Sequence, residues 1–255
     1  MTERGSGIYV LNTRPEADAV ELTVFFKDAN IPVINDPLIQ VEFLDGPVPD
    51  IANVSGLIFT SRNGVRAYVQ RSEFRGLHVY AVGDATARFA AEQGFSLVRS
   101  AGGDINSLLY LIFNEVDAKA GELLHVAGSA VAGDLVSSLL IRGYNVRREV
   151  MYEAKPAKRL STRTIEAVNN GELGSVVFFS PRTARTFARL IQGKLERSQF
   201  KCVSAYCLSS AVASEIATLP WRQVHVAQSP TLPAFLKLFA QSGELGGGDG
   251  ERSQE

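Results

Sequence analysis

The chain has 255 residues, 45% of them hydrophobic and 21% charged, which is typical of a globular protein rather than a disordered or fibrous one. Lys and Arg number 26 against 27 Asp and Glu, so there is no net positive charge to hold nucleic acid or a membrane surface. No apolar run reaches the ~20 residues of a membrane-spanning helix, and the polar N-terminus lacks the apolar segment of a secretion signal. We therefore expect a cytoplasmic protein that binds neither nucleic acid nor membrane.

Short apolar runs alternate with segments of helical spacing along the chain. Pro15 stands where the first turn of a helix tolerates proline. We expect strands at 7–13, 56–61, 78–83, 96–100, 121–128, 144–154, 175–180, 201–208 and 223–228. Helices are expected at 14–30, 63–72, 84–94, 103–116, 129–143, 162–173, 181–193, 209–219 and 231–242. This alternation predicts an α/β protein with parallel sheets that carry helices on both faces.

The length allows two domains or one large domain. Two extended stretches, 37–41 and 149–154, do not fit a simple strand–helix–strand unit, and we predict that they form a two-stranded connector. Domain one would then be discontinuous, comprising 1–36 plus 155–255, and domain two would comprise 42–148. A sequential split near residue 150 is the alternative. The Gly-rich polar tail, 242–255, is expected to be disordered.

The chain repeats one kind of strand–helix corner. "LIFTSRNGV" contains Ser61 and "VVFFSPRTA" contains Ser180, while "VYAVGDATA" and "VSAYCLSSAVA" place Thr86 and Ser210 at a second pair of corners. Carboxyl ends of parallel strands share one sheet edge, and the helix N-termini that follow offer free N–H groups to anions. Each hydroxyl has a simpler alternative role, which is to cap its helix.

Five arginines lie at or within one turn of these corners, namely Arg14, Arg62, Arg66, Arg182 and Arg185. The dipole at a helix N-terminus disfavours cations. The repeated presence of arginines there therefore favours an anion bound among them. A nucleotide is disfavoured, because residues 128–134 approach a phosphate-binding loop but Asp134 replaces its lysine. Carboxylates are the remaining anions.

Other catalytic chemistries have little support. Cys202 and Cys207 match no zinc pattern, and we expect both to be buried, reduced thiols and no metal site. His78, His125 and His225 stand in apolar runs and are expected to be ordinary strand residues. An enzyme built this way would use a hydroxyl as its proton source. Tyr152 in the connector is the best-placed candidate, and its alternative role is an aromatic cross-strand plug.

An ordered set of motifs resembles the uroporphyrinogen-III synthase family. The motifs are "TRP" (13–15), "PLIQVEF" (37–43), "FTSRNGV" (59–65), "AVGDATA" (81–87), "GGDINSLL" (102–109), "GYNVRREVMYEA" (143–154) and "VVFFSP" (176–181). The resemblance implies two similar flavodoxin-like α/β domains joined by a two-stranded ladder, with the first strand and helix in the domain that holds the C-terminus.

The resemblance also implies a cofactor-free, cyclising lyase of tetrapyrrole (haem and sirohaem) biosynthesis. Its substrate would be hydroxymethylbilane, a linear tetrapyrrole with acetate and propionate side chains, which is closed to uroporphyrinogen III with inversion of the last ring and loss of water. A monomer is implied, and a transient contact with the upstream deaminase is left open.

By matching motifs, Tyr152 would donate the proton to the departing hydroxyl, with Thr86 assisting. Substrate would be bound by Arg14, Ser61, Arg62, Asn63, Gly83, Ser180, Pro181, Arg182, Ser209 and Ser210.

Two departures from the family pattern concern substrate contacts. Cys207 stands where the family usually has glycine, and the loop 128–134 has no basic residue where the family usually has one. A non-catalytic two-domain protein that binds a polycarboxylate is the alternative function.

Overall fold

The computed structural model describes residues 8–130 and 134–241. Contacts divide the chain into two compact units, which are unit 1, Met1–Gln40 with Pro156–Glu255, and unit 2, Val41–Lys155. The domain boundaries predicted from the sequence stay a prediction. The tail 242–255, expected to be disordered, lies outside the described residues.

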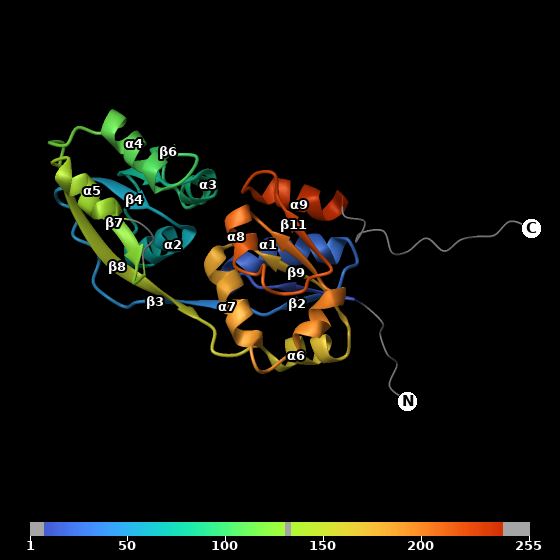
Figure 1. Ribbon diagram of the computed structural model, residues 1–255. Coiled ribbons are helices and arrows are strands. Elements are labelled where there is room, and N and C mark those ends of the chain that lie inside the picture. Colours follow the sequence, from blue (N-terminus) through green and yellow to red (C-terminus); the bar gives the residue numbers. More distant parts are fainter. Residues whose placement is uncertain (1–7, 131–133, 242–255) are drawn as a thin grey trace, which may run out of the picture. The chain divides into compact units, whose positions relative to one another are not determined.

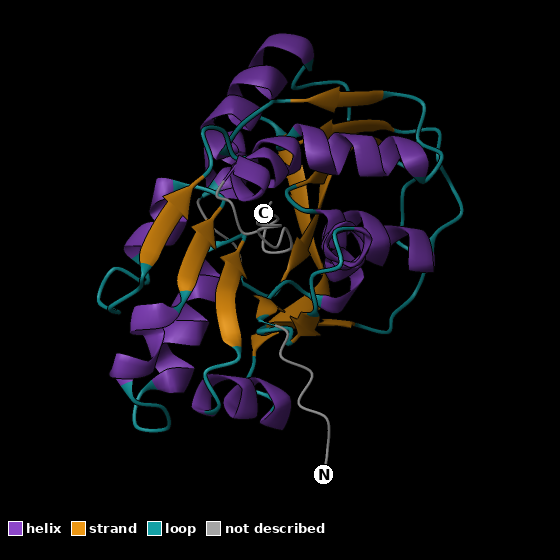
Figure 2. Cartoon of the chain, turned by 90° about the vertical axis from the view of Figure 1, so that its right-hand side faces the viewer, coloured by secondary structure: helices purple, strands orange, loops and turns teal. Residues whose placement is uncertain are grey.

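Unit 1 contains a five-stranded parallel sheet with helices on both faces (Figures 1 and 2). Successive strand residues point to opposite faces, so Val177 packs with helices α1 and α9 while Val176 packs with α6, α7 and α8. The strand order is β11-β10-β9-β1-β2. Its elements are β1 (Tyr9–Asn12), α1 (Glu16–Asp28), β2 (Val33–Asn35), α6 (Thr162–Asn169), β9 (Leu173–Phe178), α7 (Pro181–Ile191), the 3₁₀ helix η1 (Arg197–Cys202), β10 (Ser204–Cys207), α8 (Ser210–Ser214), β11 (Gln223–Val226) and α9 (Leu232–Gln241).

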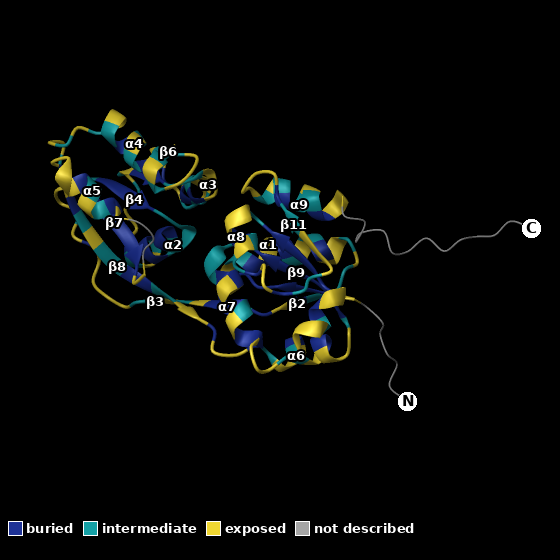
Figure 3. Cartoon of the chain, viewed as in Figure 1, coloured by how far each residue is buried: buried dark blue, intermediate teal, exposed yellow. Residues whose placement is uncertain are grey.

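Unit 2 contains a six-stranded sheet in the order β3-β8-β7-β4-β5-β6. Helices α2 and α3 contribute to the hydrophobic cluster on one face, and α4 and α5 to the cluster on the other. The central strands β4, β7 and, in unit 1, β9 are buried over almost their whole length (Figure 3). The elements of unit 2 are β3 (Ile39–Phe43), β4 (Val54–Phe59), α2 (Arg62–Arg71), β5 (His78–Ala81), α3 (Asp84–Glu92), β6 (Val98–Ser100), α4 (Ile105–Glu115), β7 (Glu122–Gly128), α5 (Leu135–Ile141) and β8 (Asn145–Pro156).

The two sheets, in which every described strand pairing except that of β3 with β8 is parallel, confirm the predicted fold class, and their strands follow different orders along the chain. Taken in chain order, the five strands of unit 1 run 2-1-3-4-5 across the sheet, which is the flavodoxin order. The five parallel strands of unit 2, β4 to β8, run 3-2-1-4-5 instead, the order of dinucleotide-binding folds. The spatial orders β11-β10-β9-β1-β2 and β6-β5-β4-β7-β8 nevertheless correspond strand for strand, because the chain enters unit 2 at the strand that corresponds to β9. The repeated corners of the sequence therefore occupy equivalent positions in the two sheets.

An antiparallel strand pair contains both places where the chain passes from one unit to the other. The amide of Leu44 donates to the carbonyl of Met151 at 2.9 Å, and the amide of Ala157 donates to the carbonyl of Leu38 at 2.9 Å. Residue numbers thus rise along β3 as they fall along β8, which makes this edge of the sheet antiparallel. These strands span Ile39–Phe43 and Asn145–Pro156, where the sequence predicted connector strands at 37–41 and 149–154.

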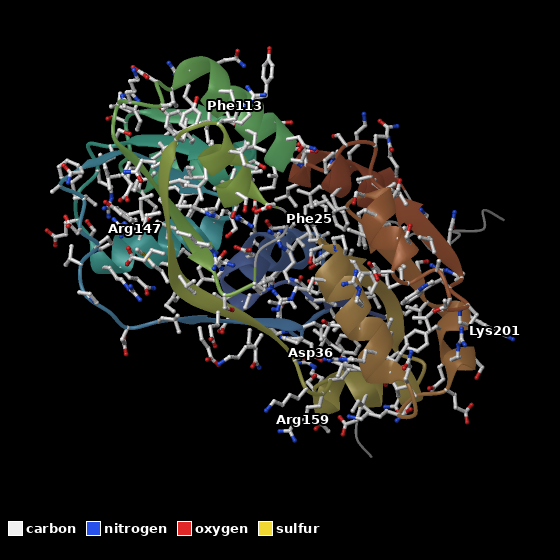
Figure 4. All side chains as sticks on the ribbon, turned by 60° about the vertical axis from the view of Figure 1, so that its left-hand side comes forward. Phe25, Asp36, Phe113, Arg147, Arg159 and Lys201 are labelled. Carbon is white, nitrogen blue, oxygen red and sulfur yellow. The ribbon has the colours of Figure 1, made fainter. Side chains whose placement is uncertain are left out.

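Two polar clusters fix the segments beside this strand pair, and Figure 4 labels the central residue of each. Arg147 on β8 donates to the Glu122 and Glu149 carboxylates, both at 2.8 Å, and to the carbonyl of Asp50 at 2.6 Å. In unit 1, buried Asp36 accepts hydrogen bonds from the Ser161 amide at 2.8 Å and from the Thr164 hydroxyl at 2.7 Å.

Several predicted elements have different bounds. The helix expected at 209–219 is only Ser210–Ser214, because the amides that follow, those of residues 215–217, bond to carbonyls three residues back instead of four. The indole of Trp221, after Pro220, donates to the carbonyl of Ile216 at 3.0 Å. The helix expected at 162–173 ends at Asn169, and Gly171 follows with φ +69°.

Three other differences are local. The helix expected at 129–143 is Leu135–Ile141, and residues 131–133 lie outside the described residues. Pro15 precedes the first helical residue instead of lying in the first turn. Cys207 is a buried, reduced thiol whose pKa burial raises to about 12, but Cys202 ends the 3₁₀ helix and is exposed, so its predicted burial was wrong.

His125 on β7 is the least usual residue of the unit 2 core. Only 2% of its surface is exposed, and neither ring nitrogen has a hydrogen-bond partner among the described residues. Burial, and secondarily the charge of Arg148, lowers the pKa of His125 to about 4 from the ordinary 6.5. This histidine is therefore neutral in the fold at neutral pH.

This histidine makes unit 2 sensitive to acid. Between about pH 6.5 and about pH 4 the unfolded chain binds a proton at His125 that the fold does not, so the free energy of unfolding falls as the pH falls through that window. The total loss is roughly 3 kcal/mol. We expect His125→Leu to flatten this part of a urea-denaturation pH profile relative to wild type. Equal slopes in wild type and His125→Leu would contradict the prediction.

Candidate active site

Each sheet has one pair of neighbouring strands whose following helices pack on opposite faces of the sheet, and we call the gap between these two strand ends its switch point. In unit 2 the neighbouring strands β4 and β7 lead to α2 and α5, which pack on opposite faces. In unit 1 the neighbours β1 and β9 lead to α1 and α7, again on opposite faces. Ligands of parallel α/β sheets bind outside the strand ends at such switch points. The corners that hold Ser61 and Ser180 lie at these two points.

At the switch point of unit 2, two hydroxyl groups meet. The phenol oxygen of Tyr152 lies 2.8 Å from Oγ of Ser61, and either can donate. Ser61 follows β4, whereas Tyr152 pairs with Gly128 at the end of β7. Only 7% of the Tyr152 surface is exposed. The structure thus places a nearly buried phenol, with a hydroxyl partner, where ligands of this fold class bind.

The first turn of α2 brings Ser61 to this position. Ser61 is extended, and its Oγ accepts from the amide of Gly64 at 3.4 Å, so it caps the helix as well as contacting the phenol. A Cβ atom on Gly64 would lie 2.9 Å from the carbonyl oxygen of Val126 on β7. The absence of a side chain at Gly64 therefore lets α2 begin directly against β7.

The corresponding corner of unit 1 has the same cap, but its hydroxyl contacts its own helix turn instead of a phenol. Oγ of Ser180 accepts from the Thr183 amide at 3.1 Å and lies 2.7 Å from the Thr183 hydroxyl, and Pro181 is the first helical residue. Across the switch point, Thr13 donates to the carbonyl of Val177 at 2.6 Å and ties the two strand ends together. This corner is held by hydrogen bonds within unit 1.

At the second pair of corners, the helix cap residues are not the hydroxyl residues that the sequence placed there. Gly83 and Ser209 are the cap residues of α3 and α8, and neither caps through its side chain. Thr86 is the third residue of α3 and is buried, and exposed Ser210 is the first residue of α8. Helix α8 has five residues and therefore only a small dipole. Any attraction of an anion by Ser209 and Ser210 would come mainly from their hydroxyl groups and not from the helix dipole.

The arginines near the corners differ in their surroundings. Arg185 forms a bidentate ion pair with Glu215, and Arg66 donates to Oδ1 of Asn63 at 2.8 Å, so both have partners within the protein. Arg14 is buried, with its guanidinium 4.3 Å above the ring of Phe179. The half-buried Arg62 and Arg182 lie in the first turns of α2 and α7.

The family assignment rests on a match to most of the chain. The family model described as Uroporphyrinogen-III synthase HemD matches residues 21–237. The chain belongs to the uroporphyrinogen-III synthase family.

Individual relatives agree with this assignment. The uroporphyrinogen-III synthase of Chlorobaculum parvum is 25% identical over 198 residues, which cover 72% of this chain and 80% of the relative. The crystal structure of the synthetase from Helicobacter pylori matches with a TM-score of 0.61 at 18% identity, covering 92% of this chain and 99% of the other. A mutant synthase of Thermus thermophilus gives 0.55 at 18% identity, covering 92% and 98%. These two structures support the fold.

The residues that the family resemblance singled out form one set in each unit. Unit 2 holds Tyr152, Thr86, Ser61, Arg62, Asn63 and Gly83, and unit 1 holds Arg14, Ser180, Pro181, Arg182, Ser209 and Ser210. Within the set of unit 2, the structure brings the hydroxyl groups of Ser61 and Tyr152 into direct contact. The roles of these residues stay predictions.

The loop after β7 lacks the basic residue usual in the family, but β8 provides a guanidinium beside it. Nη2 of Arg148 donates to the carbonyl oxygens of Gly128 at 2.7 Å and Ser129 at 3.2 Å. Sequence reasoning overlooked Gly128, Gly64 and Arg148, because their importance lies in close approaches between strands far apart in the chain. Among the described residues no group of three or more His, Cys, Asp or Glu is placed to hold a metal ion, and no helix is long and apolar enough to cross a bilayer.

The double role of Ser61 can be separated by comparison with another helix cap. We expect Ser61→Ala to cost about 1 kcal/mol of stability through the lost cap and to lower turnover about tenfold through the lost contact with Tyr152. Asp104 caps α4 of the same unit by accepting from the Ser107 amide at 2.9 Å. Asp104→Ala should therefore match the stability loss and keep full turnover, measured by thermal unfolding and by initial rates. Equal turnover in the two variants would show that Ser61 is a cap alone.

Proposed function

We propose that this chain acts as a uroporphyrinogen-III synthase, which closes hydroxymethylbilane to uroporphyrinogen III with inversion of the last ring and release of water. Family membership over residues 21–237 supports the reaction. The observation that carries the chemistry is the Ser61–Tyr152 hydroxyl pair, nearly buried at the switch point of unit 2. The alternative, a non-catalytic polycarboxylate-binding protein, is not favoured.

In the proposed reaction, the phenol of Tyr152 protonates the departing hydroxyl as its C–O bond breaks, and water leaves. The resulting cation, an azafulvenium conjugated with its pyrrole nitrogen, is attacked by the substituted carbon of the last ring, which forms a spiro intermediate. The bond between the spiro carbon and the methylene bridge to the preceding ring then breaks, which gives a second azafulvenium cation on that preceding ring. The unsubstituted α-carbon of the last ring attacks this cation and closes the macrocycle with the last ring inverted. Loss of the proton on that carbon to the phenolate of Tyr152 restores aromaticity and the acid. Only protons and electron pairs move, so the proposed steps need no redox cofactor.

The Ser61 hydroxyl has a different role here from the one predicted. The sequence predicted that it binds a substrate carboxylate, whereas its 2.8 Å contact suits it to donate to the phenolate that Tyr152 becomes after proton transfer. Buried hydroxyl–phenolate contacts are stronger than exposed ones because water does not compete. We therefore propose Ser61 as a positioning residue for the proton donor, with Thr86 the second catalytic candidate.

The remaining candidates are proposed to bind the acetate and propionate groups through first-turn N–H groups, hydroxyls and guanidinium groups. They are Arg14, Arg62, Asn63, Gly83, Ser180, Pro181, Arg182, Ser209 and Ser210. Hydroxymethylbilane also cyclises without enzyme to the uninverted isomer, so holding the chain in the correct geometry is the main task of such contacts. The cytoplasmic location, the monomeric state and the transient contact with the upstream deaminase stay predictions.

The reaction can be tested by its product isomers. Hydroxymethylbilane is generated enzymatically in the presence of the protein, the products are oxidised to porphyrins, and isomers I and III are separated by chromatography. We expect isomer III in excess over the spontaneous isomer I, in proportion to protein concentration. Isomer I alone, at the uncatalysed rate, would reject the proposed function and leave the binding-protein alternative.

The role of Tyr152 can be tested by removing its hydroxyl. We expect Tyr152→Phe to lower the turnover number at least about a hundredfold, the usual contribution of a general acid, with little change in thermal stability. Tyr80 is the matched control, since it lies on β5 of the same unit and is also 7% exposed. Tyr80→Phe should keep its turnover. An unchanged rate in Tyr152→Phe would remove this residue from the mechanism.

A further inference from the structure

The ring of Tyr152 lies directly on the backbone of Gly128. A Cβ atom built on Gly128 would be 2.8 Å from Cε2, 2.9 Å from Cζ and 3.2 Å from the phenol oxygen of Tyr152. Carbon atoms in van der Waals contact are about 3.5–4.0 Å apart, so no side chain fits at this position with the ring in place. Gly128 is not among the described glycines with positive φ, so space rather than backbone conformation requires glycine here.

The backbone around this contact has little freedom to yield. The amide of Ser129 donates to the carbonyl of Tyr152 at 2.9 Å on one edge of β8, and the Leu44 amide donates to the carbonyl of the preceding Met151 at 2.9 Å on the other edge. Arg148 donates to the carbonyl of Gly128 at 2.7 Å. A side chain at position 128 would therefore displace the phenol rather than the strands.

The direction of the phenol depends on the same contact. The Cε2 and Cζ atoms of the Tyr152 ring lie against Gly128, and the phenol oxygen of Tyr152 lies 2.8 Å from Oγ of Ser61. Ser61 is itself within reach because Gly64 lets α2 start against β7. These two glycines thus bring together three segments that are distant in the sequence.

We propose that Gly128 is a positioning residue for the reaction, whose bare backbone holds the phenol of Tyr152 in hydrogen-bonding contact with Ser61. The proposal rests on the proposed function, in which Tyr152 donates the proton. The backbone of Gly128 aligns the phenol of Tyr152, and the methyl group that Gly128→Ala adds would move this phenol out of alignment. A misplacement on the order of 1 Å costs about a hundredfold in a reaction that depends on geometry.

The test begins with Gly128→Ala. We expect the turnover number to fall about ten- to a hundredfold with little change in KM. The matched control is Gly56→Ala, because a Cβ on Gly56 of β4 would lie 2.8 Å from Cε2 of Tyr80, also in unit 2. Gly56→Ala imposes the same kind of overlap on a tyrosine outside the proposed site, so it should cost stability and keep its turnover number. Equal losses of turnover in both variants would show general strain and overturn the proposal.

A double-mutant cycle shows whether Gly128 acts through the phenol. Tyr152→Phe keeps the ring carbons and therefore the overlap, but it lacks the hydroxyl. Adding Gly128→Ala to Tyr152→Phe should lower the residual rate no further, while the loss of stability from the methyl group persists. A further loss of turnover equal to that in wild type, or a loss confined to KM, would mean that Gly128 leaves room for substrate instead, and would overturn the proposal.

The same set of variants distinguishes a failure of the proposed proton donor from a failure of the proposed positioning role of Gly128. If Tyr152→Phe keeps full turnover, the proposed proton donor is wrong. If Tyr152→Phe is impaired but Gly128→Ala is not, the proton donor stands and the positioning role fails. A direct readout is the NMR signal of Tyr152 in protein labelled with [ζ-¹³C]tyrosine and assigned by its loss in Tyr152→Phe. It should shift in Gly128→Ala and stay in place in Gly56→Ala.

A second variant serves if Gly128→Ala does not fold. Arg148→Leu adds no atom near the ring but removes the guanidinium that fixes the carbonyls of Gly128 and Ser129. We expect a smaller loss of turnover, about threefold, with broadening or a shift of the Tyr152 signal, since the lost hydrogen bonds hold the backbone under the ring and act on the phenol only indirectly. An unchanged turnover and an unchanged Tyr152 signal would count against the proposal.

Discussion

The direction of the strands is the constraint on which the arrangement of this protein depends. In a parallel sheet every strand delivers its carboxyl end to the same edge, so the residues that follow the strands gather there whatever their distance in the sequence. The reversal of chain connections between β4 and β7, and between β1 and β9, then opens one point at that edge in each unit. Ser61 and Ser180 occupy equivalent corners because each follows a strand at such a point.

Strand β8 holds Tyr152 in a fixed position beside the ends of the parallel strands. Its first part pairs in parallel with β7 and its later part pairs antiparallel with β3, so backbone hydrogen bonds hold it on both edges near Tyr152. Holding a loop residue in one orientation carries an entropic cost, whereas a strand residue with partners on both sides is already ordered. The phenol is therefore carried by one of the more rigid parts of unit 2 while lying next to strand-end loops, which as a class are more mobile.

Much of the fold could be predicted from the sequence because the information is local, and the errors arose where distant contacts decide. Apolar runs and helical spacing located nearly every strand and helix, but the hydrogen bond from Thr13 to the carbonyl of Val177, which closes the corner of unit 1, joins residues 164 positions apart. The site shows the same limit more sharply. Tyr152 and Ser61 are 91 positions apart, and only the register of β7 on β8 places Gly128 beneath the tyrosine ring. Close approaches of this kind are set by pairing between strands, and a single sequence carries no direct signal of them.

The two units differ most in what their corner hydroxyls contact, and this difference suggests how a repeated corner can serve two purposes. In unit 1 the Ser180 hydroxyl bonds within its own helix turn to Thr183, and Thr13 bonds to the neighbouring strand, so the corner is closed by its own hydrogen bonds. In unit 2 the Ser61 hydroxyl caps its helix weakly, at 3.4 Å, and makes its shorter contact with the phenol of Tyr152 from another strand. The same capped turn can thus present N–H groups to an anion in both units. The turn of unit 2 also contacts a phenol, because there a glycine at the end of the neighbouring strand leaves room for a tyrosine ring to lie across it.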